Sequence, residues 1–282
     1  MAIRFIVDSA SDILPAEAAH LGITVLPTKV LFGDREYADS VDLTHREFYE
    51  KLIETELIPT TSQVSPGDFA DACRAVVEQG DEVILITVSS RLSGTHQSAC
   101  IAASDFPGLV WVVDSENVCV GERLLVLRGL ELLEQGLSAP EIAFRLNEEK
   151  KQIRVLALLD TLEYLKKGGR ISASAAFAGS LLSIKPVIAI EDGLVVMAGK
   201  ARGSRLGNNL LRERIAKQGI DFSRPLCLAY SGLSDSVLQK YIADSAELWQ
   251  DRLQALPIAT IGCTIGAHAG PGAIAVAFFA EA

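Results

Sequence analysis

The chain has 282 residues, of which 49% are hydrophobic, and its formal net charge is -10 at pH 7. This length and apolar content suit two domains of ordinary size, while the negative charge argues against a nucleic-acid-binding protein, which needs a basic face to neutralise phosphates. Five cysteines are scattered without a CxxC pair, which argues against a disulfide framework and fits reduced thiols in a cytoplasm.

The first half of the chain alternates between apolar runs and helical patterns. Predicted strands cover residues 3–7, 23–32, 83–88 and 110–113. Predicted helices begin after Pro15 and cover residues 44–54, 66–78, 121–135 and 139–151, and a polar loop is predicted at 59–66. Thr44 and Glu47 have the spacing of a capping box. The run 83–88 is apolar throughout, which is typical of a strand buried on both faces. This alternation predicts a parallel sheet covered by helices, an α/β/α fold class, in an N-terminal domain of residues 1–153.

The second half has a different texture and predicts a further α/β domain, residues 154–282, with a mixed sheet. Predicted strands cover residues 155–159, 181–190, 194–200, 226–230, 258–261 and 273–279. Predicted helices cover residues 162–167, 208–217 and 234–249. Pro186 marks its run as an edge strand or as the start of a strand. The uncharged stretch 256–280 is interrupted by Pro257 and by Gly270-Pro271-Gly272, so we expect buried strands and a loop there, with no transmembrane segment.

Polar residues follow three of the apolar strands, as Asp8-Ser9, Ser89-Ser90 and Asp114-Ser115. Ligands of parallel α/β sheets bind outside the carboxyl ends of the strands, so these residues predict a site at that edge. The segment 89–95 turns from a strand into a helix through Ser93 and Gly94. Free backbone N–H groups and hydroxyls at such a turn favour an anion, but Ser93 or Thr95 could equally well cap its own helix. Both interpretations stay open at this point.

Other chemistry is less well supported by the sequence. A magnesium site at Asp8 and Asp12 is disfavoured because Ala10 stands where a second acidic residue would be expected. No phosphate-binding GxxxxGK[ST] loop, GxSxG elbow or HExxH motif occurs. Ser93, His268 and Asp8 could form a nucleophile, base and orienting acid, so a stand-alone serine esterase remains an alternative. Small basic clusters at 166–170 and 200–205 are either solvated faces or docking surfaces for a phosphate-bearing ligand or an acidic partner.

Taken together, the motifs resemble the DegV family, which includes the fatty-acid-binding subunits of bacterial fatty acid kinase. The resemblance spans nearly the whole chain. Its pieces are Asp8-Ser9 with Asp12, Thr61-Ser62-Gln63, Ser90 to Thr95, Asp114-Ser115, Leu162 to Ile171, Ile184-Lys185-Pro186, the Arg202 segment and His268 to Gly272. The sequence departs from the usual pattern at Val64, His96, Cys119, Glu122 and Ala269.

The resemblance implies a two-domain protein that holds one long-chain fatty acid between its domains. It places the ligand-binding positions at Thr61, Ser93, Gly94, Thr95, His268 and Gly270. It makes Arg170 and Arg202 candidates for stabilising charge or for facing a separate ATP-dependent fatty acid kinase. The apolar segment 171–184 is a candidate for the wall of an acyl tunnel.

The expected protein is therefore a cytoplasmic, bacterial lipid carrier with no catalytic residue, metal or cofactor of its own. Its expected partners are the fatty acid, the kinase and, transiently, a membrane surface, but no nucleic acid. A binder of another small carboxylic acid is the second alternative, because it would share the polar site and differ in the tunnel.

Overall fold

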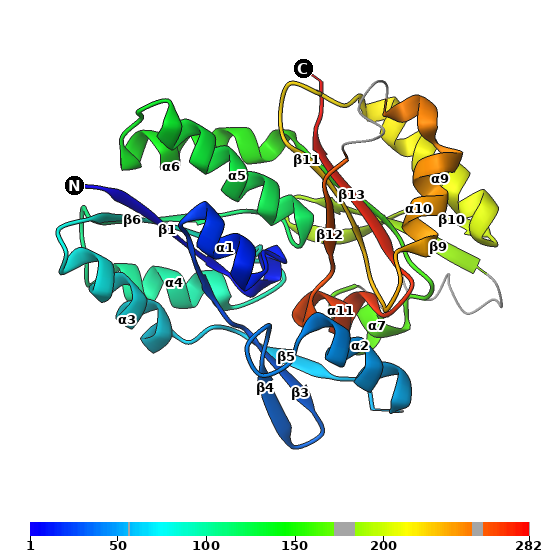
Figure 1. The fold of residues 1–282 in the computed structure, drawn as a ribbon, viewed down its shortest axis with the longest axis horizontal. Coiled ribbons are helices and arrows are strands. Elements are labelled where there is room, and N and C mark those ends of the chain that lie inside the picture. Colours follow the sequence, from blue (N-terminus) through cyan, green and yellow to red (C-terminus); the bar gives the residue numbers. More distant parts are fainter. Residues whose placement is uncertain (56, 172–183, 250–255, 282) are drawn as a thin grey trace.

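The computed structural model describes residues 1–55, 57–171, 184–249 and 256–281. Two large sheets lie side by side with helix α5 (Val120–Glu134) between them, and a small third sheet projects from one end (Figure 1). This arrangement confirms the predicted α/β class, with a parallel sheet from the first half of the chain and a mixed sheet from the second.

The parallel sheet has the strand order β2-β1-β6-β7. Its strands are β1 (Ile3–Asp8), β2 (Thr24–Leu26), β6 (Glu82–Thr87) and β7 (Val110–Asp114). Both faces are buried, because Ile84 and Ile86 point to one hydrophobic cluster whereas Val83 and Leu85 point to another. Helices α3 (Pro66–Val77) and α4 (Thr95–Ala103) cover one face, and α1 (Pro15–Leu21), α5 and α6 (Ala139–Glu149) cover the other.

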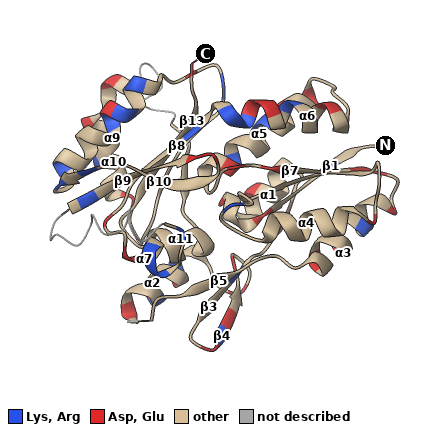
Figure 2. Cartoon of the chain, turned by 180° about the vertical axis from the view of Figure 1, so that it is seen from behind, with Lys and Arg blue, Asp and Glu red and all other residues tan. Residues whose placement is uncertain are grey.

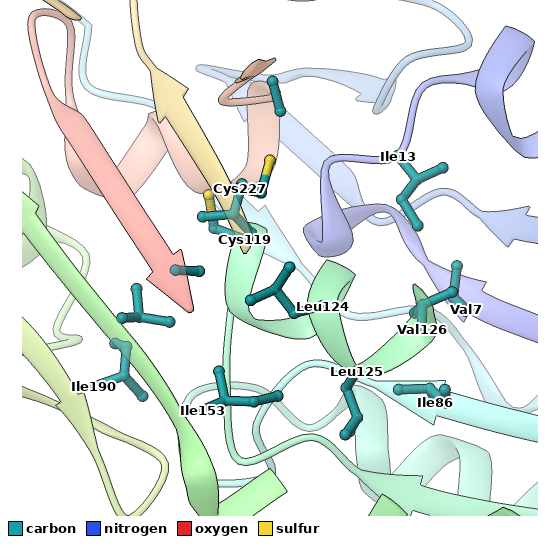
Figure 3. Packing of buried hydrophobic residues seen from close by; sticks show 14 of the residues in the cluster. Val7, Ile13, Ile86, Cys119, Leu124, Leu125, Val126, Ile153, Ile190 and Cys227 are labelled. Atoms are coloured by element: carbon teal, nitrogen blue, oxygen red, sulfur yellow. The ribbon is translucent and has the colours of Figure 1, made fainter. Parts of the chain in front are cut away.

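The mixed sheet has the order β10-β9-β8-β13-β11-β12. Among its described strands, β11 and β12 pair in parallel, and the other neighbouring pairs are antiparallel. Its strands are β8 (Ile153–Leu158), β9 (Ile184–Glu191), β10 (Leu194–Arg202), β11 (Leu226–Tyr230), β12 (Ile258–Thr260) and β13 (Ile274–Phe279). Helices α9 (Ser204–Gln218) and α10 (Ser236–Asp244) cover its outer face. Helix α5 covers the inner face, so one cluster runs from Val7 and Ile86 through Leu124 to Ile153 and Ile190 (Figure 3). The boundary at residue 153 stays a prediction.

The third sheet, β4-β3-β5, is antiparallel and joins the two halves of the chain. It consists of β3 (Lys29–Phe32), β4 (Arg35–Ala38) and β5 (Thr60–Ser62), and it packs with α2 (His45–Glu54), α7 (Glu163–Lys167) and α11 (Cys263–Ala269). The predicted capping box at Thr44 and Glu47 is confirmed. A Cβ atom at Gly266 would lie 2.6 Å from Tyr49 Oη, so the glycine permits the close approach of α11 to α2.

Two predicted elements of the first half are wrong in detail, and one strand was missed. The strand predicted over 23–32 is two strands in different sheets, β2 and β3, because Pro27 interrupts the run and cannot donate to a ladder. The loop predicted at 59–66 contains β5, whose polar residues become a strand by pairing with β3, with Thr61 opposite Val30. Strand β4, the partner of β3 in a hairpin, was not predicted.

The second half also differs from prediction in places. Helix α11 lies inside the stretch for which only strands and a loop were expected. The helix predicted over 234–249 ends at Asp244 and is followed by a 3₁₀ turn, Ala246–Leu248. Pro186 is the third residue of β9, which has β8 and β10 as neighbours, so it marks a strand start and not an edge. Of the candidate tunnel wall at 171–184, residues 172–183 lie outside the part of the chain that the structure describes. None of the described helices has the length and apolar content needed to cross a membrane.

Candidate ligand-binding site

A cavity of about 370 Å³ lies between the parallel sheet, the mixed sheet and α11. Most of its wall is apolar, and one part of that wall is the inner face of the mixed sheet. This part of the wall includes Val155, Ala157, Leu159, Ile188, Ile190 and Val195. Such a wall excludes water and favours an aliphatic ligand, because apolar surface gains free energy when it leaves water.

Polar residues gather at one end of this cavity. Thr61, Ser93, Gly94, Arg170 and His268 all line it, although they come from β5, the turn before α4, the segment after α7, and α11. The structure therefore brings together five of the eight residues singled out from the sequence. Arg91 and Arg170 also line a second hollow beside the cavity.

Thr61 and His268 form a direct hydrogen bond, 2.9 Å between Thr61 Oγ1 and His268 Nε2. His268 Nδ1 is buried and has no hydrogen-bond partner among the described residues. Burial, together with the positive charge of the nearby Arg170, lowers the pKa of His268 to about 4, so the ring is neutral at pH 7. An unpaired buried N–H costs more than an unpaired lone pair, which favours the tautomer with the proton on Nε2. In that tautomer His268 donates to Thr61, and the Thr61 hydroxyl is left to donate into the cavity.

The turn before α4 agrees with both interpretations of its sequence, a helix cap and a binding site. Ser93 Oγ accepts a hydrogen bond from the Thr95 backbone N–H at 3.2 Å and lies 2.9 Å from Thr95 Oγ1. Ser93 therefore supports its own turn, although the N-cap residue itself is Gly94, and it also lines the cavity. A Cβ at Gly94 would lie 1.9 Å from Gln63 Oε1, so this glycine is needed for the approach of Gln63. Gln63, which donates to Ser98 Oγ at 2.7 Å, was in the recognised motif but not among the predicted site residues.

Arg170 ties the two halves of the chain together at the polar end. Its Nε donates to the Leu92 carbonyl oxygen at 3.1 Å, and its Nη1 donates to the Gly168 carbonyl oxygen at 2.6 Å. The guanidinium therefore sits beside the Ser93 turn and supplies positive charge there. Two further basic residues, Lys166 and Lys167, lie in the last turn of α7, next to α11 (Figure 2).

The other three predicted positions lie outside the cavity lining. Thr95 is fully buried and contacts Ser93, so it supports the turn from behind. Gly270 ends α11 against the Tyr164 ring. Arg202 is exposed at the end of β10. Thr28 and Thr264, by contrast, line the cavity and were not predicted from the sequence. No sequence motif distinguishes these two threonines from ordinary core positions.

The hydrogen bonds of Ser93, His268 and Asp8 do not support a catalytic triad. The partner of His268 is Thr61, that of Ser93 is Thr95, and Asp8 accepts from the backbone N–H groups of Ala10 and Val88 at 2.9 Å and 2.8 Å. Burial raises the pKa of Asp8 to about 6. Among the described residues, no group of His, Cys, Asp and Glu side chains is arranged to hold a metal ion.

Comparison with known proteins decides the family. A family model described as "Uncharacterised protein, DegV family" matches residues 2–281. A DegV domain-containing protein of Deinococcus radiodurans is 37% identical over 279 residues, which cover 98% of each chain. The chain belongs to the DegV family.

Solved DegV structures have the same fold as this chain. A DegV family protein from Thermus thermophilus, described by its fatty acid binding, has a TM-score of 0.86 with 33% identity, and all of both chains is covered. A stearic acid-binding protein from Eubacterium ventriosum has a TM-score of 0.86 with 27% identity, covering 99% of this chain and 98% of the other. These structural neighbours of the DegV chain are thus fatty-acid-binding proteins by description.

Two glycines beside the site of this DegV chain, Gly270 and Gly272, allow a matched test of how tightly the residues around them are packed. Gly270 and Gly272 both have positive φ, +71° and +79°, so alanine strains the backbone at either position. A Cβ at Gly270 would lie 2.3 Å from the Tyr164 ring, whereas at Gly272 the nearest atom, Asp160 Cβ, is 3.6 Å away. We expect Gly272→Ala to destabilise the protein by about 1 kcal/mol and Gly270→Ala by at least about 2 kcal/mol more, because overpacking adds to strain. Denaturant unfolding of both variants checks this. Equal losses would show that Tyr164 moves aside freely.

Proposed function

We propose that this DegV chain binds a long-chain fatty acid, with the acyl chain in the apolar cavity and the carboxylate at Thr61 and Ser93. The observation that carries the proposal is a single cavity whose apolar wall ends in two hydroxyls beside an arginine. The descriptions of the Thermus and Eubacterium neighbours as fatty-acid-binding proteins support it.

The energetics of the cavity agree with this ligand. Each CH₂ removed from water contributes about 0.8 kcal/mol, so roughly fifteen methylenes contribute about 12 kcal/mol as an upper bound. Association and ordering offset several kcal/mol of that. A buried carboxylate without partners would cancel much of the remainder, whereas each hydrogen bond to a charged group contributes about 1.5–3 kcal/mol. The hydroxyls of Thr61 and Ser93 therefore decide whether an acid binds better than a hydrocarbon.

Protein purified from a bacterial host is expected to carry a fatty acid, because the cavity excludes water and the ligand is abundant in that host. Organic extraction and mass spectrometry should find a long-chain carboxylic acid at about one per chain. A clean extract, combined with no uptake of added palmitate or oleate, would contradict the proposal. Extraction of a short polar acid would instead support the alternative of a non-lipid acid binder, and turnover of activated esters by the pure protein would support the esterase.

We further propose that a separate kinase phosphorylates the bound carboxylate. In that reaction the carboxylate oxygen attacks the γ-phosphorus of ATP, and the products are an acyl phosphate and ADP. The sequence has no phosphate-binding loop, and developing negative charge needs cations, for which Arg170 at the polar end and Arg202 on the surface are the candidates.

Loaded protein mixed with ATP and magnesium is expected to form no acyl phosphate until a fatty acid kinase is added. Arg202→Gln should then lower turnover about tenfold or more while leaving palmitate affinity unchanged, since Arg202 lies outside the cavity lining. Arg74→Gln, on the exposed face of α3, is the matched control and should change neither quantity. Acyl phosphate formed by the pure protein alone would overturn the carrier interpretation, and normal turnover of the Arg202 variant would remove that residue from the kinase-facing surface.

A further inference from the structure

Two buried threonines from distant parts of the chain meet in the wall of the cavity. Thr28 precedes β3 and is 2% exposed, and Thr264 is in the first turns of α11 and is 8% exposed. Both line the cavity, and their hydroxyl oxygens are within hydrogen-bond distance of each other. Thr264 lies four residues before His268 on α11, so the pair is about 6 Å along the helix from the carboxylate end.

The hydroxyls continue away from the cavity as a chain that ends on a carboxylate. Thr28 Oγ1 lies 2.8 Å from Ser9 Oγ, and Ser9 Oγ donates to Asp39 Oδ2 at 3.1 Å. Ser9 Oγ also accepts from the Thr28 backbone N–H at 3.1 Å. Asp39 further accepts from Ser40 Oγ and from the Thr264 backbone N–H, both at 3.1 Å. Its oxygens thus take three hydrogen bonds, as suits an acceptor at the end of a chain.

Because this series of hydroxyls ends on the Asp39 carboxylate, which accepts hydrogen bonds, the direction of every hydrogen bond between the hydroxyls is fixed. A hydroxyl has one hydrogen to donate, and Ser9 uses its hydrogen on Asp39. Thr28 must therefore donate to Ser9, and Thr264 must donate to Thr28. The Thr264 hydroxyl hydrogen is consequently occupied, and what its oxygen can offer to the cavity is an acceptor lone pair. A ligand carboxylate or ketone is disfavoured beside such an oxygen, whereas a ligand O–H is satisfied by it.

We propose that the Thr264–Thr28 pair selects a hydroxylated acyl chain, whose hydroxyl lies a few carbons from the carboxylate and donates to Thr264 Oγ1. The proposal rests on the proposed fatty-acid function and adds a substrate class to it. The carboxylate takes the donors at Thr61 and Ser93, and the chain hydroxyl takes the acceptor one helical turn away. The two ends of the polar region thereby distinguish the carboxylate of the ligand, which accepts hydrogen bonds, from its hydroxyl, which donates one.

The test compares palmitate with palmitates that carry a hydroxyl on the β, γ, δ or ε carbon, and with ω-hydroxypalmitate as a distal control. Wild-type protein should bind at least one of the proximal hydroxy acids about three- to tenfold more tightly than palmitate, the range for one neutral hydrogen bond. The keto acid with oxygen on the same carbon should bind more weakly than palmitate, because it brings an acceptor to an acceptor. The ω-hydroxy acid should gain nothing.

Variants assign the preference to Thr264. Thr264→Val keeps the shape and should abolish the preference, and Thr264→Ser should retain it. Thr260→Val makes the same chemical change at a hydroxyl bonded to His45, outside the cavity lining, and should leave the preference intact. A preference that survives Thr264→Val, or hydroxy and keto acids that bind alike, would overturn this proposal while leaving the fatty-acid function standing. Failure of wild-type protein to bind palmitate or any of the acids would overturn the proposed function itself.

Discussion

As pH rises, the free energy of unfolding of a Glu122→Gln variant is expected to increase relative to that of the parent protein. Glu122 is in the first turn of α5, is fully buried, and neither carboxyl oxygen has a hydrogen-bond partner among the described residues. Burial raises its pKa well above the usual range, and the nearby Asp8, Asp12 and Asp114 raise it further.

The sign follows from which state holds the proton. The folded protein keeps a proton on Glu122 that the unfolded chain releases above pH 4.5, the ordinary pKa of the group. Stability from this group is therefore complete below that pH and is lost as pH rises toward the folded-state pKa. Between the unfolded-state and folded-state pKa values of this group, the loss is about 1.4 kcal/mol per pH unit. Glutamine does not titrate, so the variant escapes this loss.

Denaturant unfolding of both proteins across this pH range checks the expectation. The slope is the informative quantity, because a buried amide adds an offset that does not depend on pH. Asp8 and Asp12, whose pKa values burial raises to about 6 and about 8, are present in both proteins and cancel in the difference. Glu141→Gln is the matched control. Hydrogen bonds from Ser138 lower the pKa of Glu141, so this substitution should change the pH dependence of stability only at acid pH. Parallel pH profiles for the Glu122 variant and the parent would show that Glu122 is ionised, with solvent access, in the folded protein.

The double variant Thr61→Val, Ser93→Ala is expected to lose most of the affinity for palmitate. Each change removes one hydrogen bond to the carboxylate, worth about 1.5–3 kcal/mol, so the pair should cost about 3–6 kcal/mol if the sites are independent. Ser93→Ala also removes the acceptor for the Thr95 N–H, which should lower stability by about 1 kcal/mol. Titration of delipidated protein with palmitate, alongside thermal unfolding, separates the two effects.

Palmityl alcohol is the control ligand for this variant. It fills the same apolar cavity but carries no charge, so the variant should lose no more than about 1.5 kcal/mol per hydrogen bond with it. His268→Gln should produce a smaller loss for palmitate than Thr61→Val, because His268 acts by orienting the Thr61 hydroxyl. If palmitate and its alcohol lose equal affinity, the carboxylate does not bind at Thr61 and Ser93.

Much of this chain's local structure follows from its sequence alone. The run 83–88 predicted a strand buried on both faces, and β6 has that position in the parallel sheet. The capping box at Thr44 was predictable because its partners are three residues apart. The polar residues at strand ends likewise indicated where Ser93 would lie. Such signals work because short-range hydrogen bonds and alternating side chains depend only on neighbouring residues.

Tertiary structure alone decided the features whose partners are far away in the chain. Residues 60–62 look like a loop and become β5 because β3 supplies their pairing. The glycine-containing stretch at 263–269 becomes α11 where α2 packs against it. Thr28 and Thr264 are 236 residues apart, and only their shared connection to Asp39 gives their hydroxyls a direction. Glu122 has an ordinary helix-start position in the sequence, and its pKa is raised because the apolar core buries it and, to a smaller extent, because three other carboxylates lie nearby in space. Hydrogen-bond direction and burial depend on which groups meet in three dimensions, and sequence neighbours carry no record of that.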